Sequence, residues 1–209
     1  MEWNAVMLLG AYHGLNPGMG WLFAVALGMQ QGSARGVWRA LPPIALGHGL
    51  AVGVVLGIAA VAQIVVPLAT LKIVVASILM AFGLYRLWRH RHPVYGGMQV
   101  GFRDLTIWSF LMASAHGAGF MVLPLVMGMS ADVQASSTGH AHQMASTQAA
   151  WPLSAALGAH TLAYLVVTAL LAWIVYARVG LAILRTAWFN LDWLWACVLV
   201  VTGIIVLVV

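Results

Sequence analysis

Four histidines lie inside stretches of sequence that are otherwise apolar enough to cross a lipid bilayer. They are His13, His48, His116 and His160, and each lies in a different stretch. An ionisable side chain at that depth is energetically costly, and such residues usually face a cavity, pair with one another or bind a ligand. The four positions therefore indicate a polar site inside a membrane protein.

Imidazole is a good ligand for Zn²⁺, Ni²⁺, Co²⁺ and copper, and it binds them in its neutral form. In a membrane this matters, because a neutral side chain costs less to bury than a carboxylate does. We therefore interpret all four histidines as candidate metal ligands. A single intramembrane histidine can also simply hydrogen-bond to a neighbouring helix, so a structural role stays open for each of them.

The composition indicates an integral membrane protein. Of the 209 residues, 63% are hydrophobic and only 6% are charged, whereas soluble domains carry roughly a quarter charged residues. The sequence contains no Gly-rich phosphate loop, no serine-nucleophile motif and no nucleic-acid-binding pattern. We expect a multi-pass protein of a cell membrane, of the bacterial inner-membrane type, whose surroundings are lipid.

Six segments are long and apolar enough to form transmembrane helices of about 20 residues. Eight of the nine Lys and Arg residues lie in the connections after the first, third and fifth segments or, for Arg86, at the end of the third segment, and the exception is Lys72. Positive charge marks the cytoplasmic side of a membrane, so both termini are expected outside the cytoplasm. The segments are residues 4–29, 42–66, 70–88, 105–129, 152–176 and 190–209.

The second half of the chain resembles the first. His13 opens HGLNPGMGWLFAVALGM and His116 opens HGAGFMVLPLVMGM, while His48 follows an Ala-Leu-Gly run directly and His160 follows one with one residue inserted. Three spans per half is an odd number, so the second copy enters the membrane inverted, as in many secondary transporters. We predict one all-α membrane domain made of two inverted three-helix repeats, 1–104 with its cytoplasmic linker and 105–209.

The predicted depths allow the histidines to meet. At about 1.5 Å per residue, His13 and His116 lie roughly 15 Å into their helices, near the middle of a ~30 Å hydrocarbon core. By the same rise, His48 lies about 9 Å from the cytoplasmic side and His160 about 13 Å from the outside. The sequence gives depth only, because rotation of each helix in the bundle is not visible in it.

The first span contains a helix break after His13. The segment Asn16-Pro17-Gly18 follows directly, and Pro17 cannot donate a hydrogen bond to the carbonyl one turn earlier. Freed carbonyls and the Asn16 side chain are expected to point into a cavity, as in the discontinuous helices of transporters. Pro124 predicts a milder interruption of the fourth span.

Other polar residues near the histidines are assigned lesser roles. Tyr12, Tyr164 and Thr161 flank them and are candidates either for hydrogen bonds that hold the imidazole rings or for ordinary bonds between helices. His140 and His142 form a His-x-His pair in the long connection between the fourth and fifth spans. That pair is a candidate for weak capture of a divalent metal at the membrane exterior.

The pattern of six spans in two inverted halves resembles the lysine-exporter superfamily, and within it the nickel/cobalt exporter branch. The resemblance depends on His13 with Asn16-Pro17-Gly18, on His48, and on His140 and His142 in the loop. The second span reads GHGLAVG, without the Asp of that branch's His-x4-Asp-His signature. The resemblance implies ion-coupled export of metal ions or small solutes.

Three functions compete on the sequence alone. The first is a transporter of a transition-metal ion, or of a small solute, through a site lined by the four histidines. The second is an integral membrane metalloprotein or enzyme that permanently holds copper, haem or another metal. The third is an assembly or scaffold subunit whose histidines only pack. Each of the three functions is compatible with a homo-oligomer.

Overall fold

The computed structural model consists of helices throughout the residues it describes, which are 2–88, 101–136, 145–179 and 191–208. This confirms the all-α prediction for that part of the chain. His140 and His142, together with Arg89, Arg91 and Arg185, lie outside the described residues. The elements in chain order are α1 (Glu2–Leu15), η1 (Pro17–Met19), α2 (Trp21–Gln30), α3 (Ala34–Val65), α4 (Leu68–Trp88), α5 (Phe102–Ala115), α6 (Ala118–Ser136), α7 (Ala145–Ile174), η2 (Val175–Val179) and α9 (Leu191–Val208).

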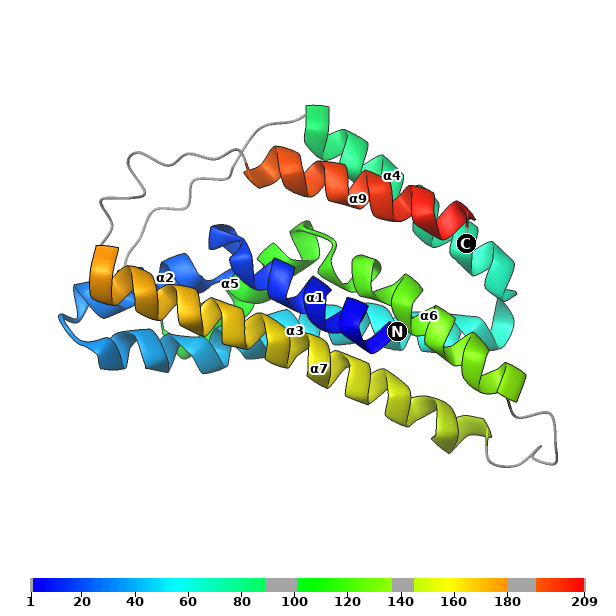
Figure 1. Ribbon diagram of the computed structural model, residues 1–209, viewed down its shortest axis with the longest axis horizontal. Coiled ribbons are helices and arrows are strands. Elements are labelled where there is room, and N and C mark those ends of the chain that lie inside the picture. The colour runs from blue at the N-terminus through cyan, green and yellow to red at the C-terminus, as the bar shows by residue number, and fades with distance from the viewer. Residues whose placement is uncertain (1, 89–100, 137–144, 180–190, 209) are drawn as a thin grey trace.

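The helices share one long axis and reverse direction along the chain (Figure 1). α1 and α2 run from right to left in this view, α3 returns, and α4, the α5–α6 pair, α7 and α9 continue the alternation. As a result, α1 begins and α9 ends in the right half of the molecule, while α3 and α5 begin, and α7 ends, toward the left.

Two helical stretches are long and apolar enough to cross a membrane, namely Ala34–Val65 and Leu153–Arg178. A third candidate is the pair formed by Phe102–Ala115 and Ala118–Met127, which bends by 63° at a short break. Shorter apolar helices cover Trp21–Gln30, Ala69–Tyr85 and Ala196–Val208. Two or three candidate spans are therefore present in the described residues, and six spans remain a prediction.

The break predicted in the first span is confirmed. α1 ends at Leu15, and Pro17 opens the 3-10 turn η1 with Asn16 as its N-cap. The Asn16 Oδ1 atom accepts a hydrogen bond from the backbone N–H of Gly18 at 2.9 Å. This bond satisfies one of the donors that the start of a helix leaves open.

The interruption of the fourth segment lies earlier than Pro124. α5 ends at Ala115, and Gly117 has a φ of +70°, a left-handed conformation that glycine adopts without steric cost and that commonly ends helices. α6 then continues through Pro124. The prediction of an interruption at Pro124 is therefore wrong in position, because the positive φ at Gly117, immediately after His116, terminates the helix first.

Glycines allow the closest helix contacts. α1 packs along α7, α3 along α5, and α4 along α9. In the last pair the contact is reciprocal: Gly83 of α4 faces Ala196 and Val200, and Gly203 of α9 faces Ala76 and Met80. Small residues at such positions let helix backbones approach closely in an apolar surrounding.

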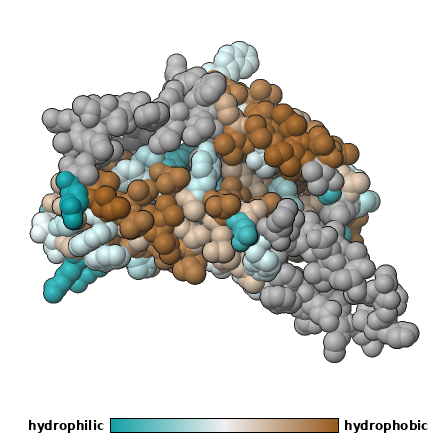
Figure 2. Space-filling model, in the orientation of Figure 1, coloured by the Kyte–Doolittle hydropathy of each residue, from teal (hydrophilic) through white to brown (hydrophobic). Residues whose placement is uncertain are grey.

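Apolar side chains also cover much of the outer surface. Figure 2 shows broad hydrophobic areas along the length of the bundle and hydrophilic residues toward its left end. On α3, Ile58, Val61, Ile64 and Val65 are all more than 60% exposed. An exposed apolar area of this extent indicates contact with lipid or with other protein.

Gly83 provides a test of this packing. A Cβ at this position would lie 2.7 Å from Val200 Cγ2 and 3.0 Å from the Ala196 carbonyl oxygen. We expect Gly83→Ala to lower the free energy of unfolding by about 1–3 kcal/mol through overpacking. Thermal and denaturant unfolding in detergent, followed by circular dichroism, measures the change.

Gly57→Ala is the matched control, because Gly57 is also inside a helix but has no heavy atom within 4 Å of a Cβ built on it. It should leave stability unchanged or raise it by roughly 0.5–1 kcal/mol, since alanine loses less backbone entropy on folding. Equal destabilisation by both variants would contradict the packing assigned to α4 and α9.

Candidate metal centre

Three of the four predicted histidines come together in the interior. His13 lies in the last turn of α1, His48 in the middle of α3 and His160 on α7. All three side chains are 0% exposed. Their packing follows from the contacts of α7, which lies against both α1 and α3.

Each of these histidines offers one ring nitrogen as a ligand atom, and the three atoms all lie within 4.8 Å of one another. The shortest distance is 3.2 Å, between His48 Nε2 and His160 Nε2. The His13 ring centroid lies 5.5 Å from that of His48 and 5.0 Å from that of His160. We call His13, His48 and His160 the histidine triad.

The triad has the spacing of a metal ligand set. Zn–N bonds of about 2.0–2.1 Å at tetrahedral angles place two ligand nitrogens roughly 3.3 Å apart. The 3.2 Å between His48 and His160 meets this requirement. Since no pair in the group exceeds 4.8 Å, His13 needs to approach by at most about 1.5 Å to complete three ligands.

Hydrogen bonds assign the protons on the paired rings. His160 Nδ1 lies 3.3 Å from the Val6 carbonyl oxygen, which only accepts, so Nδ1 carries the proton and Nε2 has the lone pair. His48 Nε2 then donates to His160 Nε2. His48 Nδ1 is buried without a hydrogen-bond partner among the described residues. A metal ion binding at both Nε2 atoms therefore requires the His48 proton to move to Nδ1.

Tyr164 supports the triad in a way the sequence did not indicate. Its ring stacks on His48 with centroids 3.8 Å apart and an angle of 9° between planes. Its hydroxyl donates to the Met19 carbonyl oxygen at the break between η1 and α2. Tyr164 thus connects the helix break to the ring of His48 by a hydrogen bond to Met19 and by ring stacking, and its hydroxyl bonds to a backbone carbonyl instead of a histidine.

Two carbonyls at the helix break accept hydrogen bonds from aromatic side chains. Trp21 Nε1 donates to the Leu15 carbonyl at 3.0 Å, and Tyr164 donates to Met19. The expectation of freed carbonyls facing a cavity is wrong for these two, because aromatic donors nearby satisfy them. The Asn16 Nδ2 group, in contrast, is buried without a hydrogen-bond partner in the described part of the chain.

The remaining flanking residues lie around the triad. The Tyr12 ring centroid is 6.4 Å from that of His13. The Thr161 side chain packs near Gly49 of α3, 3.5 Å from a Cβ built there. Pro17 contributes through the break that it starts.

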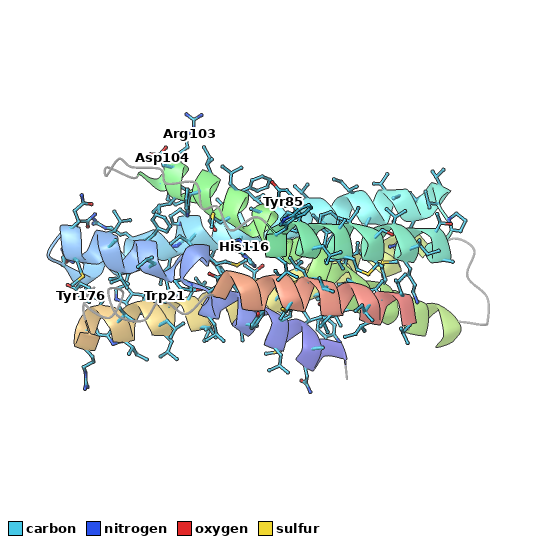
Figure 3. The ribbon with its side chains drawn as sticks, turned by 90° about the horizontal axis from the view of Figure 1, so that it is seen from above. Trp21, Tyr85, Arg103, Asp104, His116 and Tyr176 are labelled. Atoms are coloured by element: carbon cyan, nitrogen blue, oxygen red, sulfur yellow. The ribbon has the colours of Figure 1, made fainter. Side chains whose placement is uncertain are left out.

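His116 is buried but does not belong to the triad. It is 2% exposed and caps the C-terminus of α5, where its Nδ1 donates to the Met112 carbonyl oxygen at 2.7 Å. Figure 3 places it inside the bundle near the middle of its length, far from Arg103 and Asp104 at the start of the same helix.

Two residues that position the site, Val6 and Ser109, had no clear signal in the sequence. Val6 contributes only its backbone carbonyl, which any residue could supply. Ser109 donates to the Ile44 carbonyl at 2.7 Å and thereby joins α5 to α3, one turn before His48. A buried serine on an apolar helix is a weak signal, but Ser109 is one of few polar residues in its segment.

No Asp or Glu belongs to a metal-binding group among the described residues. The triad is therefore a set of three neutral donors that leaves the full charge of a bound cation uncompensated. This chemistry suits ligation of a soft or borderline transition-metal ion and does not suit Mg²⁺ or Ca²⁺, which require oxygen ligands.

No protein-family model, curated protein or solved structure matches the chain.

Tyr164 gives a test of how the site is supported. Tyr164→Phe removes the bond to Met19 and should lower the free energy of unfolding by about 1–3 kcal/mol, because a buried carbonyl loses its donor. It retains the ring on His48, so Zn²⁺ affinity should change little. Tyr164→Leu removes both contacts and should weaken Zn²⁺ binding by about tenfold in addition.

Zinc titration and unfolding of the purified variants in detergent separate the two effects. An equal loss of zinc affinity in both variants would show that the hydroxyl, and not the stacked ring, supports His48.

Proposed function

We propose that this chain is an integral membrane transporter that moves a transition-metal ion through the histidine triad. The observation that carries the proposal is the convergence of three fully buried imidazoles from three helices, with ligand atoms within 4.8 Å of one another. Buried ionisable side chains in membrane segments typically mark substrate or ion pathways.

The helix pairing supports two inverted repeats. If the first and second halves are exchanged, α1 with α2 replaces α5 with α6, α3 replaces α7, and α4 replaces α9. The exchange turns the packed pair of α1 and α7 into the pair of α5 and α3, which also pack together. It leaves the packed pair of α4 and α9 unchanged, because each of these helices takes the place of the other. Secondary transporters with inverted repeats bind substrate where the two repeats meet, near the membrane midplane.

Helix directions support six alternating spans. Along α1, Gly10 and Gly14 face successive positions of α7, near His160 and Tyr164, so these helices are parallel. Gly83, late in α4, faces Ala196 early in α9, whereas Gly203, late in α9, faces Ala76 early in α4. The helices α4 and α9 are therefore antiparallel. Both relations are those required of the first and fifth spans and of the third and sixth.

The distribution of basic residues supports an orientation with both termini outside. Arg35 and Arg39 lie in the first turns of α3, Arg103 at the start of α5 and Arg178 in η2. The ends of these elements lie toward the same end of the bundle in Figure 1. Positive charge favours the cytoplasmic side, and the resemblance to the lysine-exporter superfamily makes export the proposed direction.

The protonation of the triad supports an exchangeable ion. Binding at both Nε2 atoms moves the His48 proton to Nδ1, which has no acceptor among the described residues. An unsatisfied buried donor costs about 1–3 kcal/mol. This cost lowers the affinity for the ion and favours its release, which a transport cycle requires.

A permanently held metal is the second candidate, and the complete burial of the triad favours it. In that case the ion would remain through purification. Haem does not fit between the paired rings, because His48 and His160 are in direct hydrogen-bond contact and Tyr164 stacks on His48.

Metal binding is tested with two double variants, each of which replaces two histidines. His48→Ala/His160→Ala should weaken Zn²⁺ binding by at least about 100-fold, because it removes two of three ligands. His140→Ala/His142→Ala serves as the control and should retain the main site, losing at most a weaker second one. Equilibrium competition against a fluorescent zinc chelator in detergent gives both affinities.

Transport is then measured in liposomes that contain the purified chain and an enclosed zinc-sensitive dye. Wild type should admit or release Zn²⁺ at a rate that the His48→Ala/His160→Ala variant lowers to the protein-free rate. If the purified protein retains zinc, copper, nickel or cobalt in stoichiometric amount and shows no flux, the chain is a metalloprotein and not a transporter. Wild type that binds no added metal would refute both.

A further inference from the structure

The pair His48 and His160 lies where the two halves of the chain meet. Exchanging the halves interchanges these two residues, which follow similar Ala-Leu-Gly runs on α3 and α7, with Ala159 inserted before His160. Their Nε2 atoms are 3.2 Å apart. The exchange therefore leaves this pair of histidines together, with each residue in the place of the other. This inference rests on the proposed transport through the triad.

The third member of the triad has a counterpart that lies outside it. Exchange of the halves replaces His13 by His116, since each begins a His-Gly sequence in the first span of its half. The helix of His13, α1, packs along the helix of His160, and the helix of His116, α5, packs along the helix of His48. The two histidines therefore lie on helices that pack against different helices of the central pair, α7 in one case and α3 in the other.

The local surroundings of His13 and His116 are also alike. His116 donates to the Met112 carbonyl four residues earlier, and His13 lies in the last turn of α1. Each lies next to a helix break, before η1 in one case and before Gly117 in the other. Both are nearly or completely buried.

We propose that His116 is the alternative third ligand of the transported ion. The ion stays bound to His48 and His160, while His13 completes the site in the conformation seen here and His116 completes it in the conformation that opens to the other side. The Nδ1–H of His116 is donated to Met112, so its Nε2 retains a lone pair for the ion.

The inverted repeat supplies the physical basis for this exchange. In such transporters one repeat rocks against the other around a fixed site, and the two end states are related by interchange of the repeats. A contact made by His13 in one state is then made by His116 in the other. A ligand shared by both states, the His48–His160 pair, keeps the ion coordinated during the change.

Asparagine substitutions provide the test. Asn places its amide nitrogen near the position of the imidazole Nδ1, so His116→Asn can keep the bond to Met112 and lacks Nε2. The variants His13→Asn, His116→Asn and the double variant are compared with wild type for Zn²⁺ affinity in detergent and for Zn²⁺ flux in liposomes. His116→Cys, which restores a metal ligand at the same position, is added as a rescue.

The proposal expects different effects on binding and on flux. His116→Asn should bind Zn²⁺ within about threefold of wild type but transport at least about tenfold more slowly, and His116→Cys should regain part of the flux. His13→Asn should weaken binding at least about tenfold. The double variant should bind more weakly still, because the His116 state is then lost as well.

Three results would overturn the inference. They are wild-type flux in His116→Asn, binding in the double variant equal to that in His13→Asn, and a binding loss in His116→Asn as large as in His13→Asn, which would make His116 a simultaneous ligand. If wild type neither binds nor transports Zn²⁺, the proposed function itself fails, and that result is distinct from the other three.

Discussion

The contact among three imidazole rings in an otherwise apolar interior is the constraint on which the remaining structure depends. Burying polar rings in such a place costs free energy, which hydrogen bonds and ring contacts offset in part. His160 is held by the Val6 carbonyl and by His48, and His48 is held by Tyr164. The positions of α1, α3 and α7 follow from these requirements as well as from apolar packing.

The helix breaks and the small residues make this arrangement possible. Gly14 lets α1 approach α7, because a Cβ there would lie 2.7 Å from the Tyr164 carbonyl oxygen. The break at Asn16 and Pro17 ends α1 soon after His13, so that Met19 can accept the Tyr164 hydroxyl. The site and its support thus use the same short segment, and changes in that segment are expected to affect stability and ligation together.

Much of the candidate site could be predicted, but its composition could not. Histidines in apolar segments are unusual enough to be noticed one by one, and the Asn16-Pro17-Gly18 break follows from the chemistry of proline. Which three histidines meet depends on helix rotation, to which apolar segments with little amphipathic pattern give no guide. The break beside His116 was assigned to Pro124 because proline is a stronger signal in a sequence than a glycine with positive φ.

The sequence by itself determined the helical class, the apolar segments, the buried histidines and the first helix break, since these depend on composition and on local backbone chemistry. Only the tertiary structure decided that His13, His48 and His160 converge while His116 turns to Met112. It also decided that Tyr164 stacks on His48 and that Val6 orients His160. These contacts join residues as far apart as 154 positions in the chain, and their geometry comes from how the helices pack.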